Sequence, residues 1–286
     1  MDKPSGITSA RAVTRIKGLL PKGTKVGHTG TLDPLASGLL VLLIGRATRL
    51  SRYVTGLDKS YIASAVFGAI SDTLDADGEI TYIQNASTMP DEDAIHAATK
   101  RFTGLLYQTP PMASAIKVGG ERLYKAHRRG ETIERRSRSV TVHDFKLLIL
   151  KREENTATFA VSCGSGTYVR TLVSDLASSL GTGAYLSGLR RTRIGHLSLK
   201  EASKLDELTA DGILDRIIPS KEVVAHLPVM EISEEERSLV CNGGFVRAFG
   251  VESSERYRVE AGGELLAIYR DREGGVARAE VVLCAG

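Results

Sequence analysis

The segment from Gly27 to Gly38 holds residue types that could do chemistry, in the order Gly-His-Thr-Gly-Thr-Leu-Asp-Pro-Leu-Ala-Ser-Gly. Glycines let a backbone approach a ligand closely, and a carboxylate on a turn beside a buried strand can be held rigidly. Asp33 is therefore a candidate catalytic group. The competing interpretation is that Asp33 only begins a turn before Pro34. The segment is not a phosphate-binding P-loop or a dinucleotide fingerprint, because the required Gly-Lys-Ser/Thr and Gly spacings are missing.

Local patterns predict the elements that would position this segment. Apolar residues at helical spacing follow Ser9 and stop at Pro21, which predicts an amphipathic helix. Residues 27–37 are expected to form an ordered loop, because two glycines and an Asp-Pro step disfavour both helix and sheet. The continuous apolar run 39–44 has the length of one buried strand, and the alternation over 59–67 predicts another.

Further along the chain, helices and strands are interspersed. Asp91 is expected to cap a helix that ends at Gly104, and 169–180 carries a second helical stripe. Alternating segments 140–149 and 156–163 predict neighbouring strands. Because no regular βαβ repeat is present, we expect an α+β fold with a mixed, mainly antiparallel sheet and flanking helices.

The last quarter of the sequence changes character. A helix and linker are expected over 206–220, and Pro219 and Pro228 bracket a domain boundary. The glycine-rich remainder, with short alternating segments, predicts a small β-rich domain. We therefore expect one domain over 1–225 and a second over 226–286.

Composition sets the broad class. A chain of 286 residues with 42% hydrophobic residues can bury a full core. No apolar run approaches the roughly 20 residues that span a bilayer, and the first residues lack the apolar core of a signal peptide, so a cytoplasmic protein without a membrane partner is expected. Cys163, Cys241 and Cys284 lack metal-site spacing and are expected to be buried or half-buried thiols in a reducing compartment.

The net charge of +4 is unevenly distributed. Residues 117–138 hold eight basic and three acidic side chains, a net charge of +5. Such a stripe would attract a phosphate backbone through counterion release. A solvated helix face would show the same pattern, so charge alone leaves both explanations open. The basic residues are Lys117, Arg122, Lys125, Arg128, Arg129, Arg135, Arg136 and Arg138.

The 27–38 segment resembles the nucleophile motif of the bacterial tRNA pseudouridine-55 synthase family, the TruB family. The similarity covers roughly residues 1–225, in order and with few gaps. It runs through Asp2-Lys3-Pro4-Ser5-Gly6, Gly45-Arg46-Ala47-Thr48-Arg49, Asp58-Lys59-Ser60-Tyr61, Gly166-Thr167-Tyr168-Val169-Arg170-Thr171 and Leu189-Arg190-Arg191-Thr192. The resemblance implies the pseudouridine synthase fold, a basic RNA-binding insertion at about 105–140 and a PUA-like C-terminal RNA-binding domain.

The family's catalytic roles carry over onto four residues. The resemblance implies that Asp33 is the nucleophile, that Tyr61 stacks on the flipped uracil, and that Arg170 pairs with Asp33. Tyr168 would be a second aromatic wall or a proton-handling group. These roles fit the chemistry, because isomerising uridine requires a transient covalent adduct, and a paired arginine would keep a desolvated carboxylate ionised. Without the resemblance, both tyrosines would be ordinary half-buried aromatics and Arg170 a surface cation.

The resemblance also implies a set of RNA-binding residues. His28 would contact RNA near the flipped base, although a lone loop histidine is more often a satisfied surface group. The implied substrate is the T loop of tRNA at position 55, bound by a monomer without metal or organic cofactor. The implied substrate-binding residues are His28, Gly30, Thr31, Leu189, Lys117, Arg128 and Arg129.

The sequence departs from the family pattern in two places. The family usually has an apolar strand before the Asp-Lys-Pro-Ser-Gly motif, whereas this sequence starts at Met1-Asp2, so that strand is missing, truncated or started elsewhere, and the stability of the sheet edge is left open. Ala113 stands where the family often has tyrosine. Two rival functions remain: a tRNA-binding chaperone without catalysis, and a hydrolase that uses Asp33 with Asp72 or Asp75 to cleave a glycosidic bond.

Overall fold

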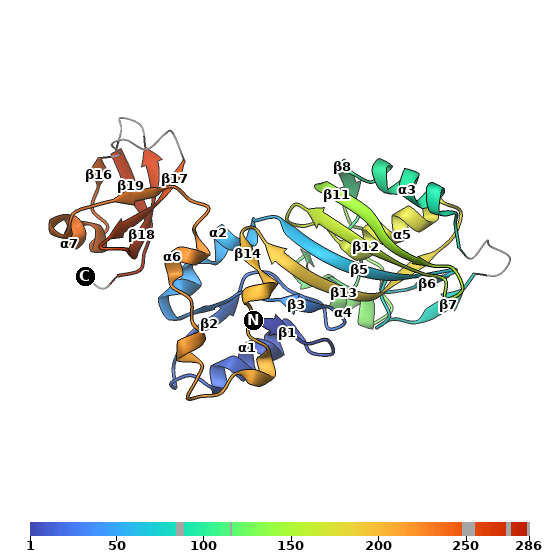
Figure 1. Ribbon diagram of the computed structural model, residues 1–286, viewed down its shortest axis with the longest axis horizontal. Coiled ribbons are helices and arrows are strands. Elements are labelled where there is room, and N and C mark those ends of the chain that lie inside the picture. The colour runs from blue at the N-terminus through green and yellow to red at the C-terminus, as the bar shows by residue number, and fades with distance from the viewer. Residues whose placement is uncertain (84–88, 115, 248–254, 273–275, 285–286) are drawn as a thin grey trace.

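The protein, seen here in a computed structural model, has a large sheet-based body and a smaller β-rich domain at its C-terminal end (Figure 1). The structure describes residues 1–83, 89–114, 116–247, 255–272 and 276–284. None of the helices in these ranges is long and apolar enough to cross a membrane.

The large body is built on one eight-stranded sheet, as the α+β prediction expected. Neighbouring strands run antiparallel except for one parallel pair, β3 with β13. The predicted strands 59–67 and 156–163 are found with those bounds, and 140–149 lies inside a longer strand. In spatial order the strands are β1 (Asp2–Lys3), β3 (Ser37–Leu39), β13 (Ala184–Ile194), β5 (Lys59–Phe67), β12 (Thr156–Cys163), β11 (Arg138–Lys151) and β8 (Gly104–Gln108), with β14 (Leu197–Ser198) beside β13.

Two predicted helices pack together with the sheet and close its main core. They are α3 (Glu92–Arg101), which follows Asp91, and α5 (Val169–Ser179), and they contact each other as well as the strands (Figure 1). The apolar stripe of α5 meets inward-facing side chains of β5 and β12 in a dry cluster. Burial of this stripe, rather than intrinsic helix propensity, accounts for the stability of α5.

The apolar run 39–44 is two short strands, not the single strand expected. Leu39 ends β3 in the main sheet, and β4 (Leu42–Ile44) pairs instead with β2 (Val26–His28). The run is apolar throughout because it passes between two separate hydrophobic clusters. The preceding helix α1 (Ser9–Gly18) lies where it was expected, with Thr8 as its capping residue.

The segment 206–220 was expected to contain a helix and a linker, and its helical parts are short 3₁₀ helices rather than one amphipathic helix. The two 3₁₀ helices of this segment are η3 (Leu205–Glu207) and η4 (Leu214–Arg216), and a third, η2 (Leu199–Glu201), precedes them. Leu205 and Ile213 are buried, whereas Leu214 and Ile217 are exposed. The apolar residues therefore form no continuous helical stripe, and the segment packs on the large sheet-based part through the separate buried side chains of Leu205 and Ile213.

The insertion and the connecting segments are short elements. The insertion contains the hairpin β9 (Lys117–Val118) and β10 (Glu121–Arg122), followed by α4 (Leu123–Arg128). A second hairpin joins β6 (Ala69–Ser71) to β7 (Ile80–Tyr82). The remaining connecting helices are η1 (Gly45–Leu50), α2 (Ser51–Thr55) and α6 (Ser220–Val223).

The C-terminal domain is a five-stranded sheet that packs against the large body. Val223 and Val224 join Leu265, Ile268 and Val281 in one cluster with apolar residues of β3, β4 and α2. The two parts thus share a hydrophobic core, so each stabilises the other. In spatial order the strands are β15 (Val229–Glu231), β17 (Arg256–Ala261), β18 (Glu264–Arg272), β19 (Val276–Val282) and β16 (Val246–Arg247), with η5 (Glu234–Glu236) and α7 (Arg237–Cys241) alongside.

The expectation that all three cysteines are thiols is wrong for two of them. Cys241 and Cys284 form a disulfide, and Cys163 is a buried free thiol. The paired cysteines are separated by 43 residues in sequence. They meet only because the end of α7 lies beside the end of β19, a neighbourhood that sequence spacing does not reveal.

Candidate active site

Asp33 lies on the loop between β2 and β3, and several backbone contacts hold this loop. Ser9 anchors it from α1, because its hydroxyl donates to the carbonyl of Leu32 at 3.0 Å and accepts from the Leu32 N–H at 2.8 Å. The Leu35 N–H donates to Oδ2 of Asp77 at 3.2 Å. The Asp33 side chain is 37% exposed, so one end of the carboxylate is held while the other can reach a ligand.

Arg170 brings two carboxylates together at this loop. Its side chain, on the first turn of α5, is only 4% exposed. Nη2 lies 2.9 Å from Oδ2 of Asp33, and Nη1 lies 3.1 Å from Oδ2 of the equally buried Asp75. The same guanidinium donates to the carbonyls of Thr73 at 2.7 Å and Ala113 at 2.8 Å. These partners satisfy a buried cation that would otherwise be costly.

Burial and Arg170 act in opposite directions on the ionisation of Asp33. Burial raises the pKa of Asp33 above its usual 3.8, and the negative charges of Asp75 and Asp77 add to this effect. Arg170 lowers the pKa but does not outweigh burial. Arg170 also contacts Asp75, so one guanidinium is shared between two carboxylates.

Two tyrosines flank the carboxylate. Tyr61 is half-buried on β5, and burial raises its pKa while the nearby Arg191 guanidinium opposes the shift. Tyr168 directly precedes α5, and its backbone is held by Gln108, whose amide accepts from the Tyr168 N–H at 3.0 Å. Burial also raises the pKa of Tyr168, and the charge of Asp33 adds to the shift. Both phenols are therefore neutral at physiological pH and present uncharged aromatic faces.

Four of the predicted substrate-binding residues lie on or next to the loop that carries Asp33, or on β13. His28 ends β2, and its buried Nδ1 has no hydrogen-bond partner in the part of the chain that the structure describes. Burial lowers the pKa of His28 and Arg191 adds to this, so the ring is neutral at pH 7. Gly30 has a φ of +131°, Thr31 is exposed, and Leu189 is half-buried on β13.

The three predicted residues of the basic insertion give a different picture. Arg129 is exposed and makes two ion pairs, with Glu121 at 2.7 Å and with Glu131 at 2.7 Å. Its donors are thus already occupied by carboxylates. The backbones of Lys117 and Arg128 lie in β9 and α4, but their side chains fall outside the described part of the structure.

Three charged residues at the site were not singled out from the sequence as part of it. Lys3 is fully buried, and its ammonium donates to the carbonyls of Pro4 and Ile7. Burial lowers the pKa of Lys3 to about 8, which Asp33 opposes. Asp75 was considered only as a hydrolytic carboxylate, and Arg191 only as part of a motif. Lys3 and Arg191 both lie in segments that resemble the family, 2–6 and 189–192, and this is the only sequence pattern that pointed to them.

In the ranges given above, no group of three or more histidine, cysteine, aspartate or glutamate side chains is arranged to hold a metal ion.

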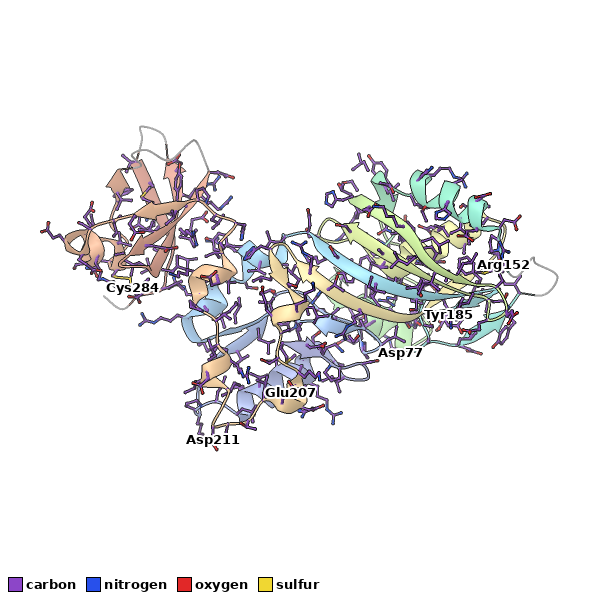
Figure 2. All side chains as sticks on the ribbon, viewed as in Figure 1. Asp77, Arg152, Tyr185, Glu207, Asp211 and Cys284 are labelled. Atoms are coloured by element: carbon purple, nitrogen blue, oxygen red, sulfur yellow. A yellow bond between two sulfur atoms is a disulfide. The ribbon has the colours of Figure 1, made fainter. Side chains whose placement is uncertain are left out.

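The disulfide lies in another part of the molecule. Asp77, labelled in Figure 2, contacts the loop that carries Asp33, and Cys284 lies far from Asp77 in the C-terminal domain. The disulfide is therefore remote from Asp33.

Comparison with known proteins decides the family. The family model for the N-terminal domain of TruB family pseudouridylate synthases matches residues 17–169, more than half of the chain, and the model for the C-terminal domain of tRNA pseudouridylate synthase B matches 170–223. The chain belongs to the TruB family. The family match spans every residue of the predicted catalytic set, from Asp33 to Arg170.

Individual relatives of this TruB-family chain are similar over most of its length. It is 40% identical to the tRNA pseudouridine synthase B of Thermobifida fusca, with 100% of this chain and 97% of the relative covered. It is 47% identical to the enzyme of the same name from Cupriavidus metallidurans, over 74% of this chain and 67% of the relative. A chain in the crystal structure of a Cbf5-Nop10-Gar1 complex matches with a TM-score of 0.73 at 26% identity, over 99% of this chain and 84% of that one.

Proposed function

We propose that this protein converts uridine to pseudouridine at position 55, in the T loop of tRNA, with Asp33 as the nucleophile. The observation that carries the proposal is the buried Arg170, which holds the Asp33 carboxylate at 2.9 Å at the mouth of a site flanked by Tyr61 and Tyr168. Such a carboxylate is oriented on one side and accessible on the other, as a nucleophile must be.

The chemistry needs only groups that this chain supplies. The Asp33 carboxylate adds to the ribose or to the base and forms a transient covalent adduct. The bond between N1 and C1′ breaks, the uracil rotates, C5 bonds to C1′, and the bond from Asp33 to the substrate breaks, which regenerates the free carboxylate. The proton lost from C5 balances the proton gained at N1, so the overall reaction is an isomerisation. Tyr61 offers a stacking face that replaces the one the base loses on leaving its stack.

Most of the tRNA-binding surface is assigned to parts of the protein away from Asp33. The relatives named above are tRNA pseudouridine synthases, which supports tRNA as the substrate. The basic insertion at about 105–140 would contact the phosphate backbone of the T arm without reading its sequence. A catalytic domain over 1–225 and a PUA-like RNA-binding domain over 226–286 complete the proposed organisation, in a monomer that needs no cofactor.

One experiment separates this proposal from its rivals. An unmodified tRNA transcript is incubated with the protein, and pseudouridine is mapped by chemical labelling and primer extension. We expect pseudouridine at a single position of the transcript, nucleotide 55. Release of free uracil would identify a hydrolase, and tRNA binding without any conversion would identify a chaperone. Modification at another position would retain the chemistry and overturn the assignment of the T loop.

A further inference from the structure

Arg191, on β13, is the largest of the fully buried side chains, with 2% of its surface exposed. A buried guanidinium loses its hydration, and this loss is unfavourable unless other groups satisfy the charge. In the described ranges, no carboxylate lies within ion-pair distance of Arg191. Its donors meet backbone carbonyls instead, and all of these carbonyls belong to the nucleophile loop and to the strand that follows it.

These contacts hold both ends of the loop that carries Asp33. At the start of the loop, Nη2 of Arg191 donates to the carbonyl of Gly30 at 3.0 Å and Nη1 to that of Thr31 at 3.5 Å. At its end, Nε donates to the carbonyl of Leu39 at 2.8 Å. A planar guanidinium with several fixed donors can span such separated acceptors, which a single ammonium cannot.

The backbone of Arg191 contacts the same loop. Arg191 is in parallel register with Gly38 of β3. Gly38 has a φ of +99°, and a β-carbon there would overlap the Arg191 carbonyl oxygen. Only glycine therefore lets β3 approach β13 this closely. The side chain and the main chain of one residue together fix the loop from both ends.

Arg191 also reaches the other proposed catalytic side chain. Across the antiparallel pair of β13 and β5, its register partner is Tyr61, so the two side chains lie on the same face of the sheet. The Tyr61 phenol and the His28 ring both experience its charge. Arg191 is thus the residue through which the Asp33 loop and the Tyr61 strand are joined.

We propose that Arg191 is a positioning residue, which sets the separation and angle between the Asp33 carboxylate and the base stacked on Tyr61. The inference rests on the proposed role of Asp33 as nucleophile. It predicts a loss in the chemical step rather than in tRNA binding, because Arg191 is buried and has no surface to offer to RNA. A displacement of about 1 Å between reacting groups can reduce a rate on the order of 100-fold.

The test uses Arg191→Lys, which keeps the charge but not the fork of donors. The matched control is Arg193→Lys on the same strand, where an exposed arginine donates to the carbonyl of Gly195 at 3.4 Å. Single-turnover rates are measured with saturating unmodified tRNA, at a temperature where melting curves show each variant to be folded. We expect Arg191→Lys to lower the rate about 30-fold or more, with the Kd for tRNA within about threefold of the wild-type value.

A second readout separates positioning from a purely structural role. Amide hydrogen exchange over residues 30–39 should accelerate in Arg191→Lys while exchange in the α5 core stays unchanged. If Arg191→Lys does not fold, Arg191→Gln is measured in the same way, because its neutral amide avoids a buried unpaired charge and keeps a donor for the loop.

The possible outcomes distinguish this inference from the proposed function. If the wild-type protein makes no pseudouridine, the proposed function fails. If the wild-type protein is active and a folded Arg191 variant reacts within threefold of its rate, the positioning role is wrong and the proposed function stands. If the variant loses tRNA affinity in proportion to its rate, Arg191 supports binding and the inference is likewise overturned.

Discussion

Arg170 and Asp33 lie in opposite halves of the sequence, yet Nη2 of Arg170 is 2.9 Å from Oδ2 of Asp33. The arginine is not dedicated to this aspartate, because Asp75 lies 3.1 Å from its other terminal nitrogen. Burial is the largest influence on Asp33 and raises the pKa of that carboxyl, although Arg170 opposes the shift. The Asp33 carboxylate is therefore oriented by an ion pair that does not offset the effect of its burial.

The first prediction is that Asp33→Asn abolishes activity and preserves the fold. An amide is a very poor nucleophile, so pseudouridine formation should fall more than about a hundredfold. Because the pKa of Asp33 is raised in the folded state, its ionisation at neutral pH disfavours folding, and this cost is absent in the variant. Arg170 retains Asp75, so the melting temperature at pH 7 should equal or exceed that of the wild type. A variant that binds tRNA normally and still reacts at more than about a hundredth of the normal rate would show that Asp33 is not the nucleophile.

The second prediction concerns pH. As the proposed nucleophile, Asp33 must be ionised, so the rate should fall as the pH drops through its raised pKa, and the acid limb should lie above 3.8. In Asp75→Asn, one of the two negative charges that raise the pKa of Asp33 is removed, and Arg170 keeps Asp33 as its ion-pair partner. We expect the acid limb of the rate to move to lower pH, together with about a tenfold or greater loss of plateau rate because Arg170 loses one of its two carboxylate anchors. The profile is measured by single-turnover assays from pH 4.5 to 8. An acid limb that does not move would mean that Asp33 does not set it.

The third prediction separates two arginines of the insertion. Arg129 is ion-paired with Glu121 and Glu131, whereas no carboxylate pairs with the exposed Arg136 in the described ranges. A phosphate must displace carboxylates to reach Arg129 but finds Arg136 unoccupied. Arg136→Ala should therefore reduce the slope of log K against log salt by about 0.7 to 0.9, and Arg129→Ala should leave it nearly unchanged. The measurement is tRNA binding across a salt series, and equal slopes for all three proteins would assign the stripe to a solvated face.

The fourth prediction concerns the disulfide between Cys241 and Cys284. Closing a loop of 43 residues restricts the unfolded chain, so Cys241→Ser should lower the free energy of unfolding by about 2 to 4 kcal/mol. Because the bond lies in the C-terminal domain, far from the Asp33 loop, the rate on bound tRNA should not change. Denaturant titration with and without a reductant checks this, and reductant should have no effect on Cys241→Ser itself. A loss of turnover in the folded variant would show that the C-terminal domain acts on the chemical step.

The sequence by itself determined the elements that depend on local pattern. The strands 59–67 and 156–163 were predicted with their observed bounds, because alternation repeats every two residues wherever one face is buried. The 27–38 motif likewise identified Asp33, and similar motifs pointed to Tyr61, Tyr168 and Arg170. These conclusions needed only neighbours along the chain or a match to a known pattern.

The tertiary structure decided what depends on neighbours in space. The run 39–44 is split between two sheets because hydrophobicity records burial but not which sheet a residue joins. The sharing of Arg170 between Asp33 and Asp75 and the clamp made by Arg191 involve groups far apart in sequence, and no periodicity records such contacts. A buried charge is stable only where the whole fold supplies its partners, so its role cannot be read before those partners are placed.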